Sequence, residues 1–421
     1  SANTSVIRFV SHNQQYSETR GRVVRNVSLA IVQALNRVRQ HYPQAIECTC
    51  LTFMELVMNP EVLFRPFDHP KLQLKNRIAM APMTRRFSPD GIPDDKVRDY
   101  YRTRAEGDVG LIITEGTTVP HKAASSDVQM PCFHDAALEG WQKVVEAVHE
   151  AGGKIAPQLW HLGARRLPGQ GPYPDYPTAS PSGCEFPGKE VGEPLSTTEI
   201  NELIGAFTHS AIAAVGLGFD AIELHGAHGY LIDDFFWEGT NQRDDKYGGS
   251  LVKRTRFAVE ILESIRAEIG DEFPLILRFS QWKGQDFTAR LAQSLEQLEE
   301  FVSPLSAAGV DIFHCSTRRF WEPEFAGSDL NLAGWVKKIT GKPTISVGSV
   351  SLSEEFIATY SEAKAEVAGI DKLITRMEAD EFDLIAVGRA LIANPAWPKL
   401  VRNGDMDAIK TYKKEMLAEL V

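Results

Sequence analysis

Eight short apolar runs, separated by longer amphipathic stretches, are the feature that most restricts how this chain can fold. The runs occupy residues 76–83, 109–116, 153–160, 220–227, 273–280, 310–317, 342–349 and 382–389. Each run is rich in isoleucine, leucine or valine and is bounded by glycine, proline or aspartate. Such runs are typical of strands that are buried on both faces of a parallel sheet.

Two parallel α/β architectures fit this alternation: a closed barrel and an open doubly wound sheet. No G-x-G-x-x-G motif follows the first run, which disfavours a dinucleotide-binding Rossmann domain. Eight strands, each followed by a helix, are the content of a single (β/α)8 TIM barrel with insertions. We therefore predict this barrel over residues 58–421, with a short hairpin at 63–77 before its first strand.

The predicted helices carry their own local signals. Ser196 and Glu199 have the spacing of a capping box, which predicts that a helix begins there. Glycines at 152–153 suit the end of the helix that precedes them. Pro304 lies inside another amphipathic stretch and predicts a break or a kink.

Residues 1–57 differ from the rest in composition. They contain six arginines, three glutamates and no lysine, a charge of +3 in a chain of net charge −11. Apolar residues from Val24 to Val38 recur at helical spacing, which predicts an N-terminal helical extension with one helix at 23–39. Its apolar stripe needs burial against the chain's own barrel or against a second subunit, as in a homodimer.

Composition excludes some partners and indicates a compartment. An acidic chain, with a pI of about 5.6, argues against a nucleic acid or an anionic membrane as partner. No apolar run approaches the roughly 20 residues that cross a bilayer. The five cysteines are few and scattered, which favours a reducing compartment and a cytoplasmic location. The arginine-rich, acid-poor composition of residues 1–57 also describes an organelle transit peptide, so targeting stays open.

Polar residues gather where the predicted strands end. In a barrel the active site lies at the carboxyl ends of the strands, so these residues would meet at one mouth. They are Thr84, Glu115, Gly116, Gln158, Trp160, His225, His228, Arg278, His314, Gly348, Gly388 and Arg389.

This set has a chemical theme. Glycines after the last two strands, together with Arg389, suit a phosphate, because backbone N–H groups can approach it closely and a guanidinium binds it through two hydrogen bonds. Gln158 offers both a donor and an acceptor, as a planar imide requires. Arg278 could face a group that becomes anionic. Together these features predict a flavin mononucleotide (FMN) site.

The motifs resemble the old yellow enzyme family of FMN-dependent ene-reductases. The resemblance covers residues 60–400, in order, across all eight strands. It rests on the segments APMTRR, EG after the second strand, QLWH, HGAHGYL, NQRDDKYGGS, LR in the fifth strand and VGRALIANP.

The resemblance implies a role for each matching residue. Thr84 would hydrogen-bond the flavin C4 carbonyl, and Trp160 would form a wall of the substrate pocket. The other residues implied to bind FMN are Pro82, Met83, Gly116, Gln158 and Arg278 at the ring and Gly348, Ser349, Gly388 and Arg389 at the phosphate. NADPH or NADH would be the reductant, and the sequence does not decide between them.

The segment HGAHGYL carries the implied catalytic residues. His225 and His228 would bind the carbonyl or nitro oxygen of the substrate and stabilise the negative charge that develops there. Tyr230 would protonate the α-carbon from the face opposite the flavin. A metal site is the competing hypothesis. It needs a third ligand, such as His314 or Glu115, and leaves Gln158 and Arg389 unexplained.

The predicted function is therefore reduction of the C=C bond of α,β-unsaturated carbonyl compounds by hydride and proton transfer. A nitroester or nitroalkene reductase could use the same site, and a metal-dependent barrel lyase or hydrolase belongs to a different class. The glycine- and proline-rich loop at 165–194 should shape the mouth. The family has a single arginine after its QLWH segment, and either Arg165 or Arg166 could take that place.

Overall fold

The computed structural model describes residues 59–353 and 364–421. The predictions for residues 1–57 lie outside the described residues and stay predictions. Residues Pro60–Val421 form one compact unit, and the rest of this subsection concerns that unit.

Eight parallel strands close into a barrel, as predicted. The order of strands round the barrel is β10-β11-β13-β3-β4-β5-β8-β9. Barrel strands that follow one another in the sequence are therefore neighbours in the sheet. Every barrel strand lies within or overlaps one of the eight apolar runs. The strands are β3 (Ile78–Met80), β4 (Leu111–Thr118), β5 (Lys154–Trp160), β8 (Ile222–His228), β9 (Leu275–Lys283), β10 (Ile312–Ser316), β11 (Thr344–Val347) and β13 (Leu384–Val387).

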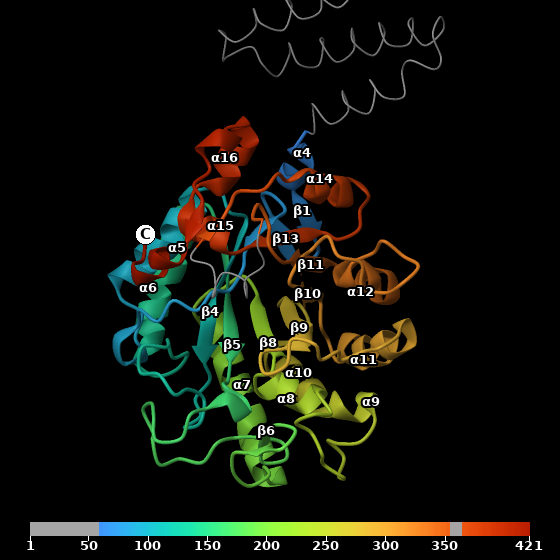
Figure 1. Cartoon of the computed structure of the whole chain (residues 1–421). Helices are drawn as coiled ribbons and strands as arrows, with labels where there is room; N and C mark the ends of the chain where they lie inside the picture. Colours follow the sequence, from blue (N-terminus) through green and yellow to red (C-terminus); the bar gives the residue numbers. More distant parts are fainter. Residues whose placement is uncertain (1–58, 354–363) are drawn as a thin grey trace, which may run out of the picture. The chain divides into compact units, whose positions relative to one another are not determined.

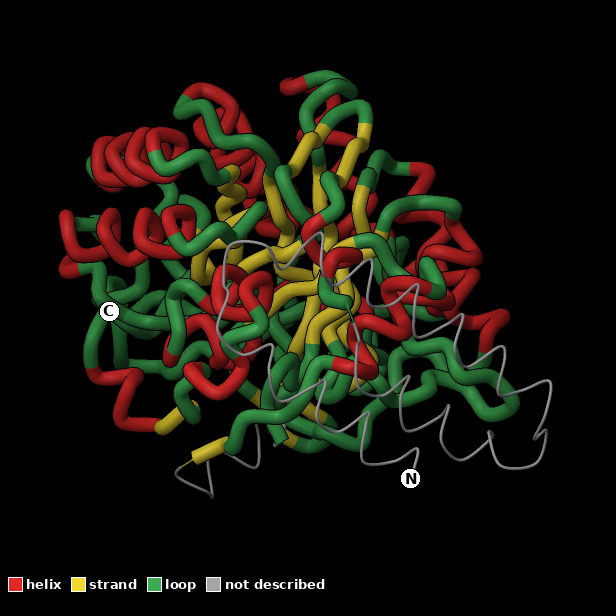
Figure 2. Tube along the Cα trace, turned by 90° about the horizontal axis from the view of Figure 1, so that it is seen from above, coloured by secondary structure: helices red, strands yellow, loops and turns green. Residues whose placement is uncertain are grey.

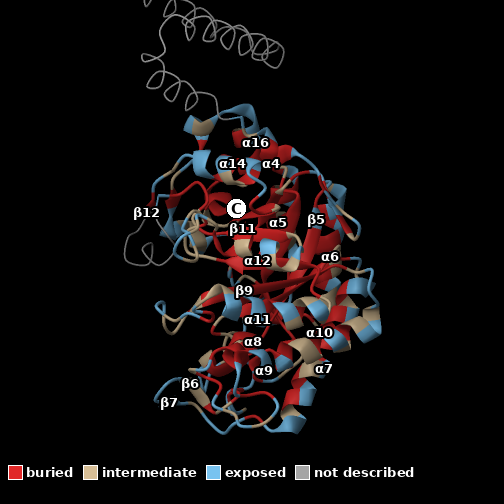
Figure 3. Ribbon diagram, turned by 90° about the vertical axis from the view of Figure 1, so that its right-hand side faces the viewer, coloured by how far each residue is buried: buried red, intermediate tan, exposed pale blue. Residues whose placement is uncertain are grey.

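Helices follow the strands and surround them (Figures 1 and 2). They bury one face against the barrel and expose the other, so buried and exposed colours alternate along them in Figure 3. The main ones are α5 (Asp95–Glu106), α6 (Ala137–Glu150), α7 (Thr197–Gly216), α10 (Arg256–Ile269), α11 (Leu295–Ala307), α12 (Leu332–Thr340), α14 (Asp371–Glu378) and α16 (Trp397–Asn403).

Short elements complete the barrel unit. Helix α4 (Glu61–Phe64) precedes the barrel, α8 (Leu231–Phe236) and α9 (Leu251–Arg254) follow β8, and α15 (Arg389–Ala393) follows β13. The small antiparallel pairs are β1 (Phe67–His69) with β2 (Leu72–Leu74), β6 (Cys184–Phe186) with β7 (Lys189–Glu190), and β12 (Lys364–Ala365) with β14 (Tyr412–Lys413). The 3-10 turns are η1 (Pro89–Gly91), η2 (Gly163–Arg165), η3 (Met406–Ala408) and η4 (Lys414–Ala418).

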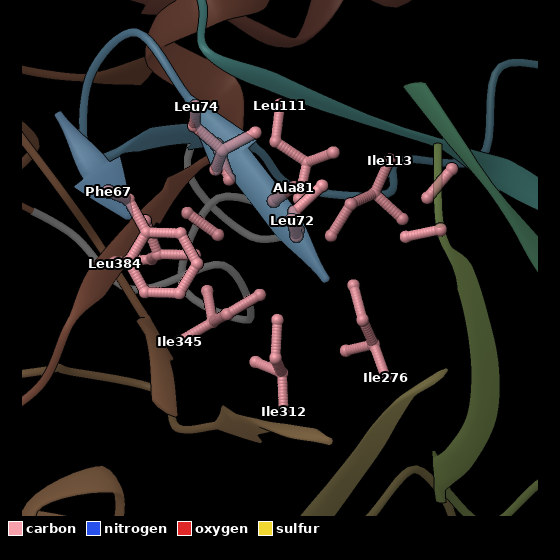
Figure 4. Close-up of a cluster of buried hydrophobic side chains, with 14 of the residues drawn as sticks. Phe67, Leu72, Leu74, Ala81, Leu111, Ile113, Ile276, Ile312, Ile345 and Leu384 are labelled. Carbon is pink, nitrogen blue, oxygen red and sulfur yellow. The ribbon is translucent and has the colours of Figure 1, made fainter. Parts of the chain in front are cut away.

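The β1–β2 hairpin closes the end of the barrel where the strands begin. Phe67, Leu72 and Leu74 pack into one buried cluster with residues at the amino ends of the strands, including Leu111 and Ile312 (Figure 4). This apolar plug leaves the opposite, carboxyl end of the barrel for polar side chains.

Of the local helix signals in the sequence, one prediction is confirmed and one is wrong. The predicted capping box at Ser196 is present, with both of its reciprocal hydrogen bonds to Glu199. The predicted break at Pro304 is wrong, because α11 runs through it to Ala307. Pro304 lies in the last turn, where little helix remains to be lost. No described helix is long and apolar enough to span a membrane.

Candidate active site

A cavity of about 490 Å³ opens at the carboxyl ends of the barrel strands. This volume is in the range of small-molecule and cofactor sites. Every residue predicted above to bind cofactor or substrate lines it. They are Pro82, Met83, Thr84, Gly116, Gln158, Trp160, His225, His228, Tyr230, Arg278, Gly348, Ser349, Gly388 and Arg389.

An irregular end of β8 brings the two histidines to the same side. Side chains alternate along a strand, so residues three apart would normally point to opposite faces. Between Gly226 and His228 the register shifts, and the extra residues lie on β9, between Phe279 and Lys283, while His228 departs from strand conformation with left-handed backbone. As a result the rings of His225 and His228 lie 5.1 Å apart, edge to face, and both line the cavity.

The turn that follows β8 brings Tyr230 to the cavity. His228 and Gly229 both have left-handed backbone, with φ of 65° and 71°, which is unfavourable for a residue with a side chain. Asp233 holds the turn, since its Oδ2 accepts the Gly229 N–H at 2.7 Å. Lys283 in turn binds Asp233 Oδ1 at 2.5 Å, and neither side chain of this pair is exposed.

His225 is prepared as a neutral donor. Burial, and then the charge of Arg278, lowers the pKa of His225 well below its usual value. Its Nδ1 accepts the Ala227 N–H at 3.3 Å, so in the neutral ring Nε2 carries the hydrogen. Nε2–H has no acceptor among the described residues and is available to a ligand in the cavity.

His228 is neutral for the same reasons but is tied to the barrel. Burial and Arg278 lower its pKa well below the usual value. Its Nε2 lies 2.8 Å from the Oγ of Ser316 on β10, and Arg278 donates to that same oxygen at 3.1 Å. Trp282 stacks on the His228 ring at 4.5 Å. The hydroxyl of Ser316 therefore links this imidazole to the buried guanidinium.

Tyr230 stands between aromatic rings and a cation. Its ring meets Trp160 at 5.3 Å and His225 at 4.9 Å, both edge to face. The guanidinium carbon of Arg165 lies 4.9 Å from the centre of the Tyr230 ring. The phenol is thus held beside the imidazole of His225.

A buried carboxylate holds Gln158. Glu223 on β8 accepts the side-chain N–H of Gln158 at 2.7 Å through Oε1 and faces His314 Nδ1 at 2.6 Å through Oε2. Because Gln158 uses one N–H on Glu223, its carbonyl oxygen and second N–H remain for a ligand.

The opposite side of the cavity is cationic. Arg389 begins α15 and its Nη2 lies 3.4 Å from the Ser349 hydroxyl, while Tyr412 and Lys414 come from the C-terminal segment. No aspartate or glutamate is among the described residues that line the cavity. The Nε of Arg278 is buried without an acceptor in the described part of the chain. A cationic end and unused donors in the middle fit the phosphate and the ring of the predicted FMN.

The structure also separates residues that the sequence grouped together. Glu115 and His314 follow the same strand ends but do not line the cavity. Glu115 accepts the N–H groups of Arg85 and Arg86, and burial raises its pKa to about 7. In the described part of the chain, no three histidine, cysteine, aspartate or glutamate side chains are arranged to hold a metal.

Some lining residues escaped prediction from the sequence. Trp282, Phe287 and Ser316 carry no motif, and only the barrel closure brings them to the mouth. The two candidate arginines lie in different surroundings. Arg165 lines the cavity, whereas Arg166 is buried in the loop and donates to the carbonyls of Tyr173 and Tyr176.

Comparisons with known proteins agree with one another. Residues 62–407 match the model of the NADH:flavin oxidoreductase / NADH oxidase family. An NADH oxidase of Thermoanaerobacter brockii is 36% identical over 351 residues, 80% of this chain, and this chain spans half of that protein. An NADPH dehydrogenase of Halalkalibacterium halodurans is 33% identical over 347 residues, 80% of this chain and 93% of that protein.

Two solved structures are also similar to this chain. Morphinone reductase in complex with tetrahydroNAD superposes with a TM-score of 0.71 at 27% identity, covering 84% of this chain and 93% of that one. The old yellow enzyme homologue of Zymomonas mobilis superposes with a TM-score of 0.70 at 26% identity, covering 84% and 96%.

Proposed function

We infer the function of this chain from its family, the NADH:flavin oxidoreductase / NADH oxidase family, which is the family of the old yellow enzymes. The chain is therefore an FMN- and NAD(P)H-dependent oxidoreductase. We propose that it reduces the C=C bond of α,β-unsaturated carbonyl compounds. The observation that carries this proposal is the arrangement of His225, His228 and Tyr230. Two neutral imidazoles and a phenol share one cavity, with the ring contacts given above.

The cavity residues divide between cofactor and substrate. Arg389, Ser349, Gly348 and Gly388 would hold the phosphate of FMN, and Arg278 would lie at its ring. Gln158, Thr84, Gly116, Pro82 and Met83 would complete the ring site. When bound at these residues, FMN would supply hydride transfer from NAD(P)H to the β-carbon of the substrate.

The imidazoles would act on the carbonyl oxygen. As hydride reaches the β-carbon, the electron pair of the C=C bond moves toward this oxygen and leaves it negative. Nε2–H of His225 is a preorganised donor to it, and His228 is the second donor. Because both rings are neutral, they stabilise the developing charge without transferring a proton in advance.

Tyr230 would complete the reaction by giving its proton to the α-carbon and recovering one from solvent. The balance is one substrate, one NAD(P)H and one proton in, and the saturated carbonyl compound and NAD(P)+ out. Trp160 would pack against the substrate, since its ring already contacts Tyr230.

A nitroalkene or nitroester is a second candidate substrate for the same site. Nitro oxygens accept hydrogen bonds as a carbonyl does, and the pair of neutral donors favours them equally.

The test separates the two half-reactions. Replacing His225 and His228 together with alanine should slow the oxidation of reduced enzyme by cyclohexenone, with a loss on the order of 2.7–4 kcal/mol per donor. Stopped-flow spectra would follow this step and, separately, flavin reduction by NADPH. A double variant that binds FMN and still turns over cyclohexenone at the wild-type rate would refute the proposal.

A further inference from the structure

Arg165 is a cation of the cavity that the proposed mechanism does not use. It ends the η2 turn after β5, and its guanidinium lies over the Tyr230 ring at 4.9 Å. Its one hydrogen bond within the described residues is a long one, from Nη1 to the carbonyl oxygen of His228 at 3.3 Å. Most of its five N–H donors therefore remain available beside the group that would deliver the proton.

No carboxylate of the described residues forms an ion pair with Arg165, and buried Asp234 interacts with it only at longer range. Two other cations of the loop and its surroundings differ in this respect. Arg243 is paired with Asp245 at 2.6 Å, and Lys189 is paired with Glu185 at 2.5 Å. A half-buried guanidinium without a counter-ion is costly unless a ligand supplies the charge.

Gly284 keeps a space open for this guanidinium. A Cβ at Gly284 would lie 2.4 Å from Nη1 of Arg165 and 2.8 Å from the carbonyl oxygen of His228. The backbone of Gly284 is not left-handed, so its conformation does not require glycine. Space is the remaining reason for a glycine here, and the guanidinium of Arg165 and the carbonyl oxygen of His228 occupy that space.

We propose that Arg165 binds a carboxylate of the substrate, so that the preferred substrate class is small enones that bear a carboxylate on the side of the double bond away from the carbonyl. The inference rests on the proposed function. The carbonyl oxygen would be bound at His225 and His228, the double bond would lie beside Tyr230, and the carboxylate would reach the guanidinium beyond it.

Two other roles predict different behaviour. If Arg165 only supports the Tyr230 ring, its loss should slow carboxylate and ester substrates equally. If it binds a phosphate of the dinucleotide, its loss should weaken NADPH or NADH in the reductive half-reaction and leave substrate choice unchanged.

The experiment compares the holoenzyme's kcat/KM for (E)-4-oxopent-2-enoate with that for its methyl ester. The pair differs in charge but not in the reacting enone. We expect the wild type to prefer the carboxylate and Arg165→Met to lower the acid-to-ester ratio by about 10- to 100-fold, the size of one or two charge-assisted hydrogen bonds. Arg165→Lys, which keeps the charge, should recover part of the ratio, and Gly284→Ala should lower it by displacing the guanidinium.

Lys189→Met is the matched control. It removes one positive charge from the same loop, but from a side chain that is 51% exposed and paired with Glu185. The acid-to-ester ratio of kcat/KM for Lys189→Met should equal that of the wild type. An unchanged ratio in Arg165→Met, with or without weaker NADPH binding, would overturn the inference while leaving ene-reduction intact. Failure of every variant and of the wild type to reduce the ester would instead refute the proposed function.

Discussion

Lys283→Met should destabilise the barrel by removing one partner of a buried ion pair. Lys283 and Asp233 are both fully buried and lie 2.5 Å apart. Breaking such a pair from one side costs about 3–5 kcal/mol, because the remaining charge is left without compensation. The double variant Asp233→Asn, Lys283→Met leaves no charge behind, so most of this loss should be recovered.

The pH dependence gives a further check on this reasoning. Burial already raises the pKa of Asp233, and loss of Lys283 would raise it more. A carboxyl group with a raised folded-state pKa favours the folded protein at low pH and loses that contribution as pH rises. The penalty of Lys283→Met should therefore be smaller at pH 5 than at pH 8.

The assay is urea unfolding of the wild type, both single variants and the double variant at the two pH values. Exposed Lys143→Met on α6 is the control for loss of a lysine, since its side chain is 55% exposed. If Lys283→Met lies within about 1 kcal/mol of the wild type, or if the double variant is no more stable than Lys283→Met, the buried-charge argument fails.

Four further predictions test the site and its support. Tyr230→Phe should slow oxidation by cyclohexenone at least 100-fold while NADPH reduces the flavin at nearly the wild-type rate, and equal slowing of both steps would count against a proton donor. Glu223→Gln should weaken FMN binding about 10-fold in a fluorescence titration, because Gln158 loses a charged partner, whereas exposed Glu299→Gln should not. The pKa of Glu115 is about 7 instead of 4.5, so its contribution to stability is present below pH 4.5 and is lost as pH rises through 7. In urea unfolding, the free energy of unfolding of Glu115→Gln should therefore rise by about 2–3 kcal/mol relative to that of the wild type between pH 5 and pH 8. A chain that starts at Met58 should bind FMN and keep kcat within a few-fold but be less stable or differ in light-scattering mass, and a monodisperse product without FMN would contradict this.

The spacing and composition of the apolar runs were enough to predict the barrel from the sequence. Strands buried on both faces leave an apolar run that is visible without a structure, and eight of them left few architectures to consider. The resemblance to the old yellow enzyme family then indicated which residues would form the site, and all of them line one cavity. What stayed hidden depends on contacts between distant segments. Trp282 and Ser316 lie at the mouth only because β9 pairs with β8 and β10 pairs with β9.

The geometry of the HGAHGYL segment could not be predicted either. Alternation along a strand would have placed His225 and His228 on opposite faces, and nothing in the amino-acid sequence indicates that the pairing of β8 with β9 becomes irregular there. This irregularity depends on the pairing of β8 with β9, and the left-handed turn depends on Asp233 and Lys283. Glycine at 229 is compatible with such a turn but also with many others.

Buried carboxylates support the cavity from behind its wall, and this division of charge is what the chemistry needs. Glu223 holds Gln158, Asp233 holds the Gly229 turn, and Glu115 holds the backbone that follows Thr84. None of the three lines the cavity. A carboxylate in the wall would raise the pKa of the two imidazoles, which burial and Arg278 now keep neutral, and would repel the phosphate of FMN. An acidic chain can thus build a cationic site by keeping these three carboxylates one layer away from the ligand, where hydrogen bonds to the backbone and to neighbouring side chains satisfy them.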